Sequence, residues 1–218
     1  MSILTDFFSN LPDKLIELLY LAPIVLISIT FHEYAHALTA YWLGDKTAKE
    51  EGRLSLNPIK HIDPIGAIFF LIFKFGWAKP VPVRSLYFKN PKRDFALTAA
   101  AGPAMNFILC FIAVPLLAVS FIFKNEIAYT FFYFFIVLNV GFAIFNLIPI
   151  APLDGSRILM LFLPSHIYNR VLQYEQFGFI ILILLMFTGV FGTYFGGIIY
   201  AVSGVFFTMA RFIVGLFI

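Results

Sequence analysis

LLYLAPIVLISITFHEYAHALTAYWLG, residues 18–44, is an apolar run with two histidines and a glutamate in its second half. The run is longer than the ~20 residues that an α-helix needs to cross ~30 Å of hydrocarbon. Ionisable side chains inside such a span are costly unless they have partners, so their presence indicates a functional site. The stretch therefore predicts a transmembrane helix that carries chemistry.

The composition of the whole chain is that of a bilayer protein. Of its 218 residues, 61% are hydrophobic and only 12% are charged, whereas soluble domains are about 25% charged. We therefore expect one integral membrane domain over residues 1–218, surrounded by lipid. The net charge of +3 is small, and no nucleic-acid partner is expected. The single Cys110 cannot form an intramolecular disulfide.

Five long apolar stretches predict the helices of this domain: 15–44, 95–123, 127–149, 177–192 and 195–218. The fourth stretch is marginal in length for a membrane span. A sixth apolar run, at 65–77, is shorter and contains a lysine, which indicates an interfacial or re-entrant segment. The fold class predicted is an all-α polytopic membrane protein of five to six helices, with a short re-entrant or β element on the cytosolic side.

The basic residues predict the orientation of the chain. Residues 44–94 hold ten of the fifteen Lys and Arg residues, so the positive-inside rule places this segment in the cytosol and the N-terminus outside. Residues 150–176 then return to the cytosolic side, provided that the run at 65–77 does not cross. No signal peptide is expected, because residues 1–13 lack Lys and Arg and cleavage at 35–37 would cut the histidine motif.

Two stretches of the cytosolic segment have extended character. Residues 47–60 include a short alternating pattern, which predicts a strand or a hairpin arm at the cytosolic face. Residues 76–84 contain Pro80 and Pro82, which exclude a helix. An accessible edge there can pair with a peptide strand. A loop anchored at headgroup level through Trp77 is the equal alternative.

The sequence HEYAH, residues 32–36, has the spacing of a zinc site. On a helix, His32 and His36 lie nearly above one another and present two imidazoles to one ion. Glu33 stands beside them as the base for a zinc-bound water. A lone intramembrane histidine usually just bonds a neighbouring helix, but the complete motif within a span favours zinc.

A zinc site needs a third protein ligand, and Asp154 is the best candidate. Residues 149–155 contain prolines and a glycine that break a regular helix at the cytosolic end of the third long span. Broken backbone at membrane depth is tolerated only against protein or water. The alternative for Asp154 is a helix-end residue that caps the helix or pairs with Arg157. The other histidines, His61 and His166, fall in loop sequence.

Two asparagines in apolar helix are also candidates for the site. Asn146 lies eight residues before Asp154 and can donate to a scissile carbonyl or to the oxyanion that it becomes. Asn106 follows a run of small residues that lets two helices approach closely. The alternative for both is an interhelical hydrogen bond. We favour a catalytic role for Asn146 and leave Asn106 open.

The motifs HEYAH, GWAKPVPV, AAGPAMNF and NLIPIAPLDG follow one another along residues 20–160. In this order they resemble the site-2 protease family of intramembrane zinc metalloproteases. The resemblance implies zinc on His32, His36 and Asp154, one ion per chain, with Glu33 as the catalytic residue. It also implies a three-helix catalytic core within about residues 15–160, which leaves 177–218 as accessory spans.

The same resemblance implies a function in regulated intramembrane proteolysis, with transmembrane segments of other proteins as substrates. The chain resembles a short branch of the family that lacks PDZ and CBS domains. We expect a protein of a bacterial-type plasma membrane with its active site toward the cytosol. The alternative from another class is a membrane transporter or metal-handling channel that uses the same residues. Conduction, however, needs several weak sites along a path rather than one cluster.

Overall fold

The computed structural model describes residues 11–73, 76–164, 177–178, 180–182, 184 and 190–217. Its elements are helical: α2 (Leu11–Trp42), α3 (Thr47–Glu50), η1 (Pro58–Lys60), α4 (Pro64–Phe73), η2 (Ser85–Tyr87), α5 (Pro91–Ile122), α6 (Glu126–Asn146), α7 (Asp154–Met160) and α10 (Val190–Val214). Of the described helices, α2, α5, α6 and α10 are long and apolar enough to cross a membrane. The protein is therefore an all-helical integral membrane protein within this described part.

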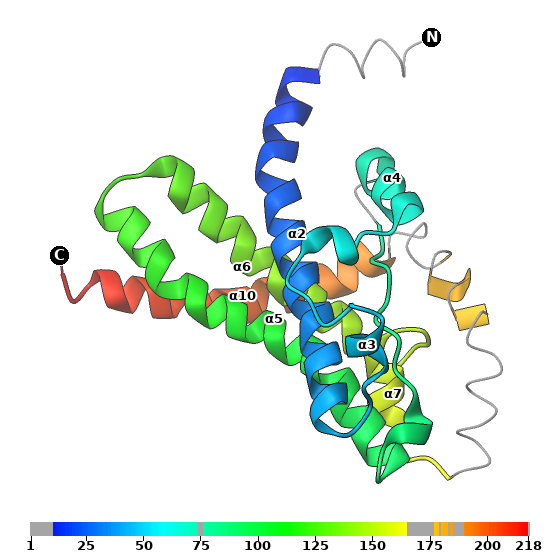
Figure 1. The fold of residues 1–218 in the computed structure, drawn as a ribbon. Coiled ribbons are helices and arrows are strands. Elements are labelled where there is room, and N and C mark those ends of the chain that lie inside the picture. The colour runs from blue at the N-terminus through cyan, green and yellow to red at the C-terminus, as the bar shows by residue number, and fades with distance from the viewer. Residues whose placement is uncertain are drawn as a thin grey trace.

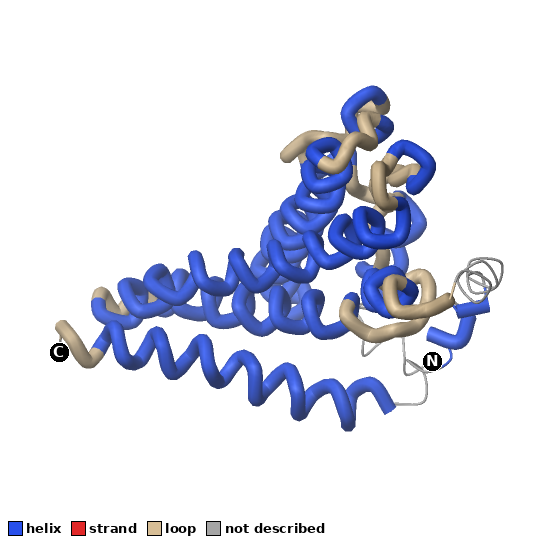
Figure 2. Tube along the Cα trace, turned by 90° about the horizontal axis from the view of Figure 1, so that it is seen from below, coloured by secondary structure: helices blue, strands red, loops and turns tan. Residues whose placement is uncertain are grey.

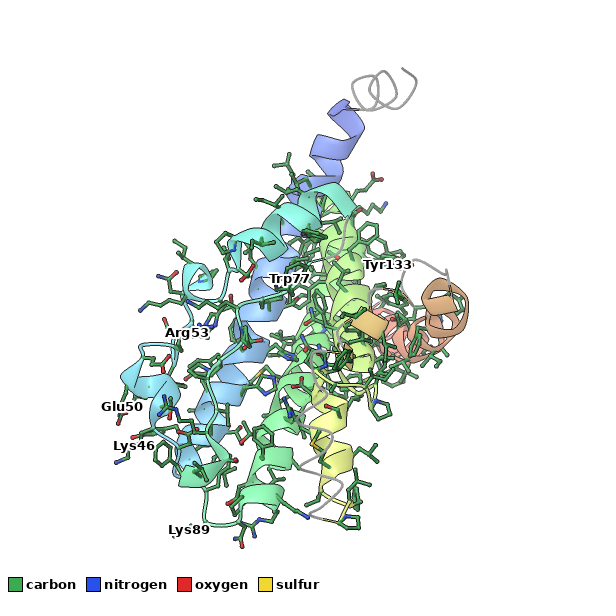
Figure 3. All side chains as sticks on the ribbon, turned by 90° about the vertical axis from the view of Figure 1, so that its right-hand side faces the viewer. Lys46, Glu50, Arg53, Trp77, Lys89 and Tyr133 are labelled. Atoms are coloured by element: carbon green, nitrogen blue, oxygen red, sulfur yellow. The ribbon has the colours of Figure 1, made fainter. Side chains whose placement is uncertain are left out.

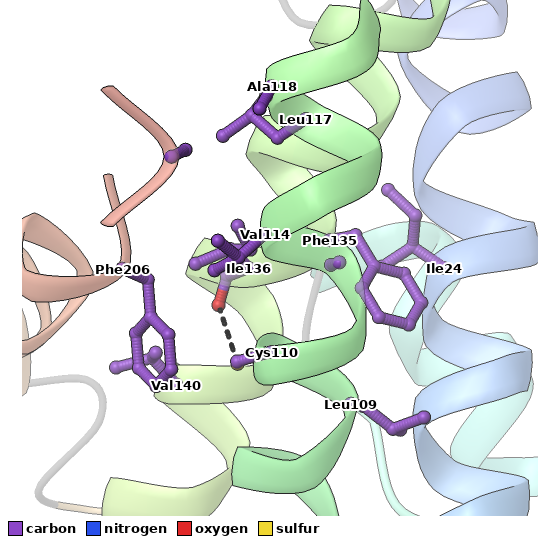
Figure 4. Packing of buried hydrophobic residues seen from close by; sticks show 12 residues of the cluster. Ile24, Leu109, Cys110, Val114, Leu117, Ala118, Phe135, Ile136, Val140 and Phe206 are labelled. Carbon is purple, nitrogen blue, oxygen red and sulfur yellow. Dashed lines mark hydrogen bonds between the residues drawn. The ribbon is translucent and has the colours of Figure 1, made fainter. Parts of the chain in front are cut away.

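The long helices pack around one apolar core. Helices α5 and α6 form an antiparallel hairpin, which α2 crosses and α10 accompanies (Figure 1). Seen from below, three long helices run side by side toward the C-terminus (Figure 2). The core between them holds apolar side chains from all four helices, among them Ile24, Cys110, Val114, Ile136, Val140 and Phe206 (Figure 4). The Cys110 thiol lies in this cluster and donates to the carbonyl of Ile136.

Local signals explain where helix α5 begins. Pro91 occupies the first turn, where its missing N–H is no loss. The Asp94 carboxylate accepts a hydrogen bond from the backbone N–H of Asn90, the N-cap residue, at 2.9 Å. This bond from the first turn back to the N-cap stabilises the start of the helix. Pro103 and Pro115 stay inside the helix, as the packed surroundings of membrane helices allow. Helix α5 thereby begins four residues earlier than the apolar pattern predicts, at 91 rather than at 95.

The helices cover four of the five predicted spans. Helix α6 ends at Asn146 rather than at 149, because the following residues turn into the loop before α7. The predicted span at 177–192 lies largely outside the described residues. Helix α4 has ten residues, which at 1.5 Å each give about 15 Å of length. This is half the hydrocarbon thickness, so α4 by itself does not cross the membrane.

The segment between α2 and α5 differs from the prediction of a strand within 47–60. These residues form α3, a turn with Gly52 at φ +65°, and η1, where Asn57 caps the N–H of Ile59. The turn and the cap form hydrogen bonds with backbone N–H and C=O groups that a strand would offer to a neighbouring strand. In the described residues, β-type pairing is limited to one antiparallel bridge between Ile62 and Ala78. Residues 78–84 carry no helix, in agreement with their alternating prolines.

Charged residues of this segment lie along one side of the molecule. Figure 3 shows Lys46, Glu50, Arg53 and Lys89 on that side, away from Tyr133 on α6. Arg53 is buried, and its guanidinium donates a hydrogen bond to the carbonyl oxygen of Lys79 at 2.6 Å. This bond ties the loop after α3 to the non-helical segment that follows α4.

Candidate metal centre

His32 and His36 lie one turn apart on α2 and are both buried. His32 Nδ1 lies 2.6 Å from Asn106 Oδ1, and His36 Nδ1 lies 2.8 Å from the carbonyl oxygen of Thr98. Both partners are oxygens that only accept, so each Nδ1 carries the proton and donates it. Each neutral imidazole then presents an unprotonated Nε2, which is the form that binds a metal.

Asp154 reaches the histidine pair from α7. The loop between α6 and α7 is held by short-range backbone bonds, among them Ile150 N–H to Ile148 O and Leu153 N–H to Ile150 O. Gly155 follows directly, and a Cβ at this position would run into the carbonyl oxygen of Leu147. The missing side chain therefore allows the start of α7 to pack on the end of α6.

Three ligand atoms converge on one point. Asp154 Oδ2 lies 3.2 Å from His32 Nε2 and 3.4 Å from His36 Nε2, and the two Nε2 atoms are 3.0 Å apart. With both protons on Nδ1, these three atoms face each other with lone pairs only, which is repulsive unless a cation stands among them. Tetrahedral zinc with bonds near 2.0–2.1 Å spaces its ligands by about 3.3 Å. The three residues therefore fit a zinc ion.

Asp154 can supply the negative charge of such a site. A cation among the three ligand atoms would favour the ionised form of the carboxyl, and a carboxyl must be ionised to bind a metal.

Gly102 on α5 makes room for this centre. A Cβ at this position would lie 2.5 Å from His36 Nε2 and 2.6 Å from both Cε1 and Nε2 of His32. No heavy side-chain atom fits there, so α5 can approach the imidazoles only with glycine. Gly102 is not recognisable as a site residue from the sequence, although the run of small residues around it indicates close helix packing.

A chain of buried amides orients His32 from behind. Asn106 holds His32 Nδ1 through its oxygen and donates through its nitrogen to Asn139 Oδ1 at 2.8 Å. Asn139 then donates to Ser28 Oγ at 2.8 Å and to the carbonyl of Phe135 at 2.9 Å. The structure thus places Asn106 directly against the ring of His32. Sequence reasoning missed Asn139 and Ser28, whose only signal was a polar residue in an apolar helix.

Glu33 is bound by the segment that follows α4. Its Oε2 accepts a hydrogen bond from the backbone N–H of Val81 at 2.9 Å, and the side chain is buried. Val81 lies between Pro80 and Pro82, which have no N–H to offer. Of these three consecutive residues, Val81 alone can therefore hold the carboxylate through its backbone N–H.

A cavity of about 580 Å³ opens beside these residues. It lies between α2, α4, the end of α6 and the segment near Trp77, and His32, Glu33 and Asn146 are among its lining residues. Asn146 is half-buried and donates to the carbonyl of Phe142 in its own helix at 3.0 Å. The structure thus brings Asn146 to the cavity rather than into the three-ligand cluster. His166 lies outside the described residues.

Among the described residues, a helical HExxH motif and a distant aspartate thus form a group with the geometry to hold a metal ion. Comparisons with known proteins point to the same class, zinc metalloproteases. The model of Peptidase family M50 matches residues 121–189, a range that includes Asp154 but neither His32 nor His36. A protein of Bacillus subtilis named putative zinc metalloprotease YwhC is 43% identical over 176 residues, which cover 78% of this chain and 80% of that protein.

More distant relatives have the same kind of name. Proteins named putative zinc metalloprotease Rip2 are 28% identical in Mycolicibacterium smegmatis and 26% in Mycobacterium tuberculosis strain H37Rv. Each match covers 80% of this chain and 69% of the relative. No solved structure matches the chain. The chain belongs to Peptidase family M50, the site-2 protease family, and is an intramembrane zinc metalloprotease.

Proposed function

We propose that this protein hydrolyses peptide bonds within or near transmembrane segments of other membrane proteins. His32, His36 and Asp154 would hold one zinc ion, and Glu33 would move the proton. The observation that carries this assignment is the convergence of two unprotonated Nε2 atoms and one carboxylate oxygen within 3.4 Å of one another.

Glu33 acts as the base and then as the acid of the reaction. Zinc, when bound, supplies Lewis acidity toward water and toward the substrate carbonyl. The Glu33 carboxylate takes the proton of the attacking water and delivers it to the leaving amide nitrogen. The bond from Val81 N–H holds one oxygen of Glu33 in place throughout. Asn146, at the cavity wall, can donate its second amide proton to the carbonyl oxygen as charge develops there.

The cavity receives the segment to be cut. Its wall is mostly apolar, with Phe70, Trp77, Phe142 and Phe145 among the lining residues, so it suits side chains that come from a bilayer. The backbone of a substrate helix is engaged in hydrogen bonds between residues four apart. The substrate must therefore unwind locally before a carbonyl reaches the centre, and helix-breaking residues near the cut would ease this step.

The active site would face the cytosol of a bacterial-type plasma membrane. Ten of the fifteen basic residues lie between α2 and the first turn of α5, which the positive-inside rule assigns to the cytosol. Helix α4, too short to cross and rich in exposed apolar side chains, would enter the bilayer from that side as a re-entrant segment. The relatives compared above are bacterial proteins.

The chain would form one membrane domain with two parts. Residues 15–160 would be the catalytic core, because every described residue of the metal centre falls within them. Residues 177–218 would be accessory spans. Among these, α10 packs on α5 and α6 through Phe206 and Ala210 and contributes no side chain to the described ligand cluster.

The test measures zinc per chain and cleavage of a transmembrane reporter by the protein purified in detergent. Glu33→Gln should keep the metal and lose at least about 100-fold in cleavage rate, the contribution of one acid–base group. His32→Ala should lose both metal and cleavage. The matched control is Glu50→Gln, which removes an exposed carboxylate of α3 and should change neither.

Two results would contradict the proposal. Normal cleavage by Glu33→Gln would remove Glu33 from the mechanism. Wild-type protein without zinc that conducts ions in liposomes would instead favour a transporter. No comparison favours that alternative.

A further inference from the structure

The backbone N–H that binds Glu33 belongs to a non-helical segment, residues 79–84. No helix or strand fixes the position of Val81 there, and two of the six residues are prolines without an N–H. The side chain of Val81 packs with Ala37 of α2 and Ala48 of α3 in a small apolar cluster. Apolar contact is non-directional, so the direction of the N–H toward Glu33 must be set by other bonds.

Asp45 binds one end of this segment. Its Oδ2 accepts a hydrogen bond from the backbone N–H of Arg84 at 2.6 Å, and its Oδ1 accepts from the N–H and the hydroxyl of Thr47 at 2.9 and 2.6 Å. Asp45 is completely buried, which is rare for an aspartate unless its oxygens are paired. Its backbone is fixed to the end of α2, because its N–H donates to the carbonyl oxygen of Ala40 at 2.9 Å.

Arg53 binds the other end of the segment. Its Nη2 donates to the carbonyl oxygen of Lys79 at 2.6 Å, and Arg53 is itself buried. The N–H of Lys79 donates to the carbonyl oxygen of His61 at 3.0 Å, so both backbone groups of Lys79 are engaged. The N–H of Val81 therefore lies between two anchored residues. The two side chains that anchor them carry charge, are buried, and have no part in the reaction itself.

We propose that Asp45 and Arg53 are positioning residues that orient Glu33 through the 79–84 segment. By fixing the two ends, they hold the middle of the segment so that the N–H of Val81 meets the Glu33 carboxylate at 2.9 Å. Neither Asp45 nor Arg53 lines the cavity, so they act on the proton transfer and not on substrate binding. The inference rests on the proposed function, in which Glu33 moves the proton.

The experiment separates the chemical step from substrate binding, with the whole chain in detergent. The probe is a fluorescein-labelled apolar peptide of about 25 residues, long enough for one span, with a central Asn–Pro pair. Asp45→Ala removes the acceptor for the N–H of Arg84. Arg53→Met removes the donor to Lys79 and keeps an unbranched apolar stem, whereas Arg53→Lys keeps a cation that can donate. Zinc per chain and Tm are measured for every variant.

Asp45→Ala and Arg53→Met should each lower kcat by about three- to tenfold, the value of one hydrogen bond, with KM changed by less than about twofold. Zinc should stay at one per chain. Arg53→Lys should recover most of the lost kcat. In a Glu33→Gln background, which does not cut, neither substitution should change the Kd for the peptide measured by anisotropy.

Val81→Pro distinguishes positioning from a purely structural role. In this variant the segment has no N–H for Glu33, so Asp45 and Arg53 have nothing left to orient. Adding Asp45→Ala or Arg53→Met to Val81→Pro should therefore lower kcat by less than about twofold, whereas independent effects would multiply. A loss of stability, in contrast, should lower Tm in both backgrounds.

Asp94→Ala is the matched control. Asp94 is also a buried carboxylate that accepts from a backbone N–H, that of Asn90 at 2.9 Å, but this bond lies at the start of α5. Its loss should lower Tm and leave kcat of the zinc-loaded protein unchanged.

Two results would show that the inference is wrong while the protease remains. In the first, Asp45→Ala and Arg53→Met cut the peptide at the wild-type rate. In the second, they lose as much kcat in the Val81→Pro background as alone. If Asp45→Ala holds no zinc, Arg53→Met and Arg53→Lys decide the question. Zinc-loaded wild-type protein that does not cut the peptide would contradict the proposed function itself.

Discussion

Replacing Gly102 by alanine adds one methyl group directly against the metal ligands. The new Cβ would lie 2.5 Å from His36 Nε2, whereas ordinary contacts begin near 3.4 Å. Either the two rings or helix α5 must therefore move by about 0.9 Å. Metal–ligand distances tolerate about 0.2 Å, so the displacement is several times what the site can absorb.

We expect Gly102→Ala to weaken zinc binding by about 100-fold or more, or ~2.7 kcal/mol. This exceeds the loss expected from a mutated partner behind a ligand, because a ligand itself is displaced. Alanine is the better helix former by about 1 kcal/mol, which offsets part of the cost of about 1–3 kcal/mol that such overpacking imposes on the metal-free protein. Zinc affinity is measured by chelator competition in detergent, and Tm is measured in excess chelator.

Gly141→Ala in α6 is the control for this variant. Its Cβ would meet only Ile199 Cδ1 at 3.7 Å, an ordinary contact, so zinc affinity should be unchanged. Gly102→Ala protein that holds zinc as tightly as wild type would refute the reasoning, since it would mean that α5 does not approach the imidazoles as described.

Three further predictions concern the groups around the centre. Asn106→Ala should reduce zinc affinity about 10–100-fold, because it removes the acceptor that holds His32 Nδ1. Asn106→Asp keeps an acceptor oxygen and should reduce zinc affinity less. Chelator competition measures both affinities. Val81→Pro removes the N–H that holds Glu33, so kcat should fall about tenfold at unchanged zinc content. Val81→Ala keeps the N–H and is the control. An unchanged kcat in Val81→Pro would exclude a role for this bond. Removal of the metal by a chelator should abolish reporter cleavage, and added zinc should restore it; activity that survives chelation would argue against a metal-dependent reaction.

Membrane character and the histidine pair follow from local sequence. The apolar runs are long enough to identify α2, α5, α6 and α10 as spans. The spacing of His32, Glu33 and His36 has a fixed meaning once the segment is helical. The strand expected within 47–60 was wrong, because backbone bonds of the turn at Gly52 and the cap at Asn57 overrode a weak alternating pattern.

The residues that contact the histidines and Glu33 could not be predicted from local sequence. The bonds from Asn106 to Asn139 and from Val81 to Glu33 join residues 33 and 48 positions apart. Nothing in the local pattern says which faces of two apolar helices meet, because nearly every face is apolar. Ser28 and Thr30 illustrate this, since they are alike in sequence and yet one hydroxyl is bonded and the other is not.

The sequence by itself determined that the chain is a membrane protein with an HExxH helix, and that Asp154 is the best candidate for a third ligand. Only the tertiary structure decided that Asp154 meets both imidazoles, that Gly102 admits α5 to their side, and that Glu33 is bound by Val81. The physical reason is the range of the interactions. Helical spacing and burial in lipid act over one or two turns, whereas a metal centre depends on close approach between helices that the chain order alone does not specify.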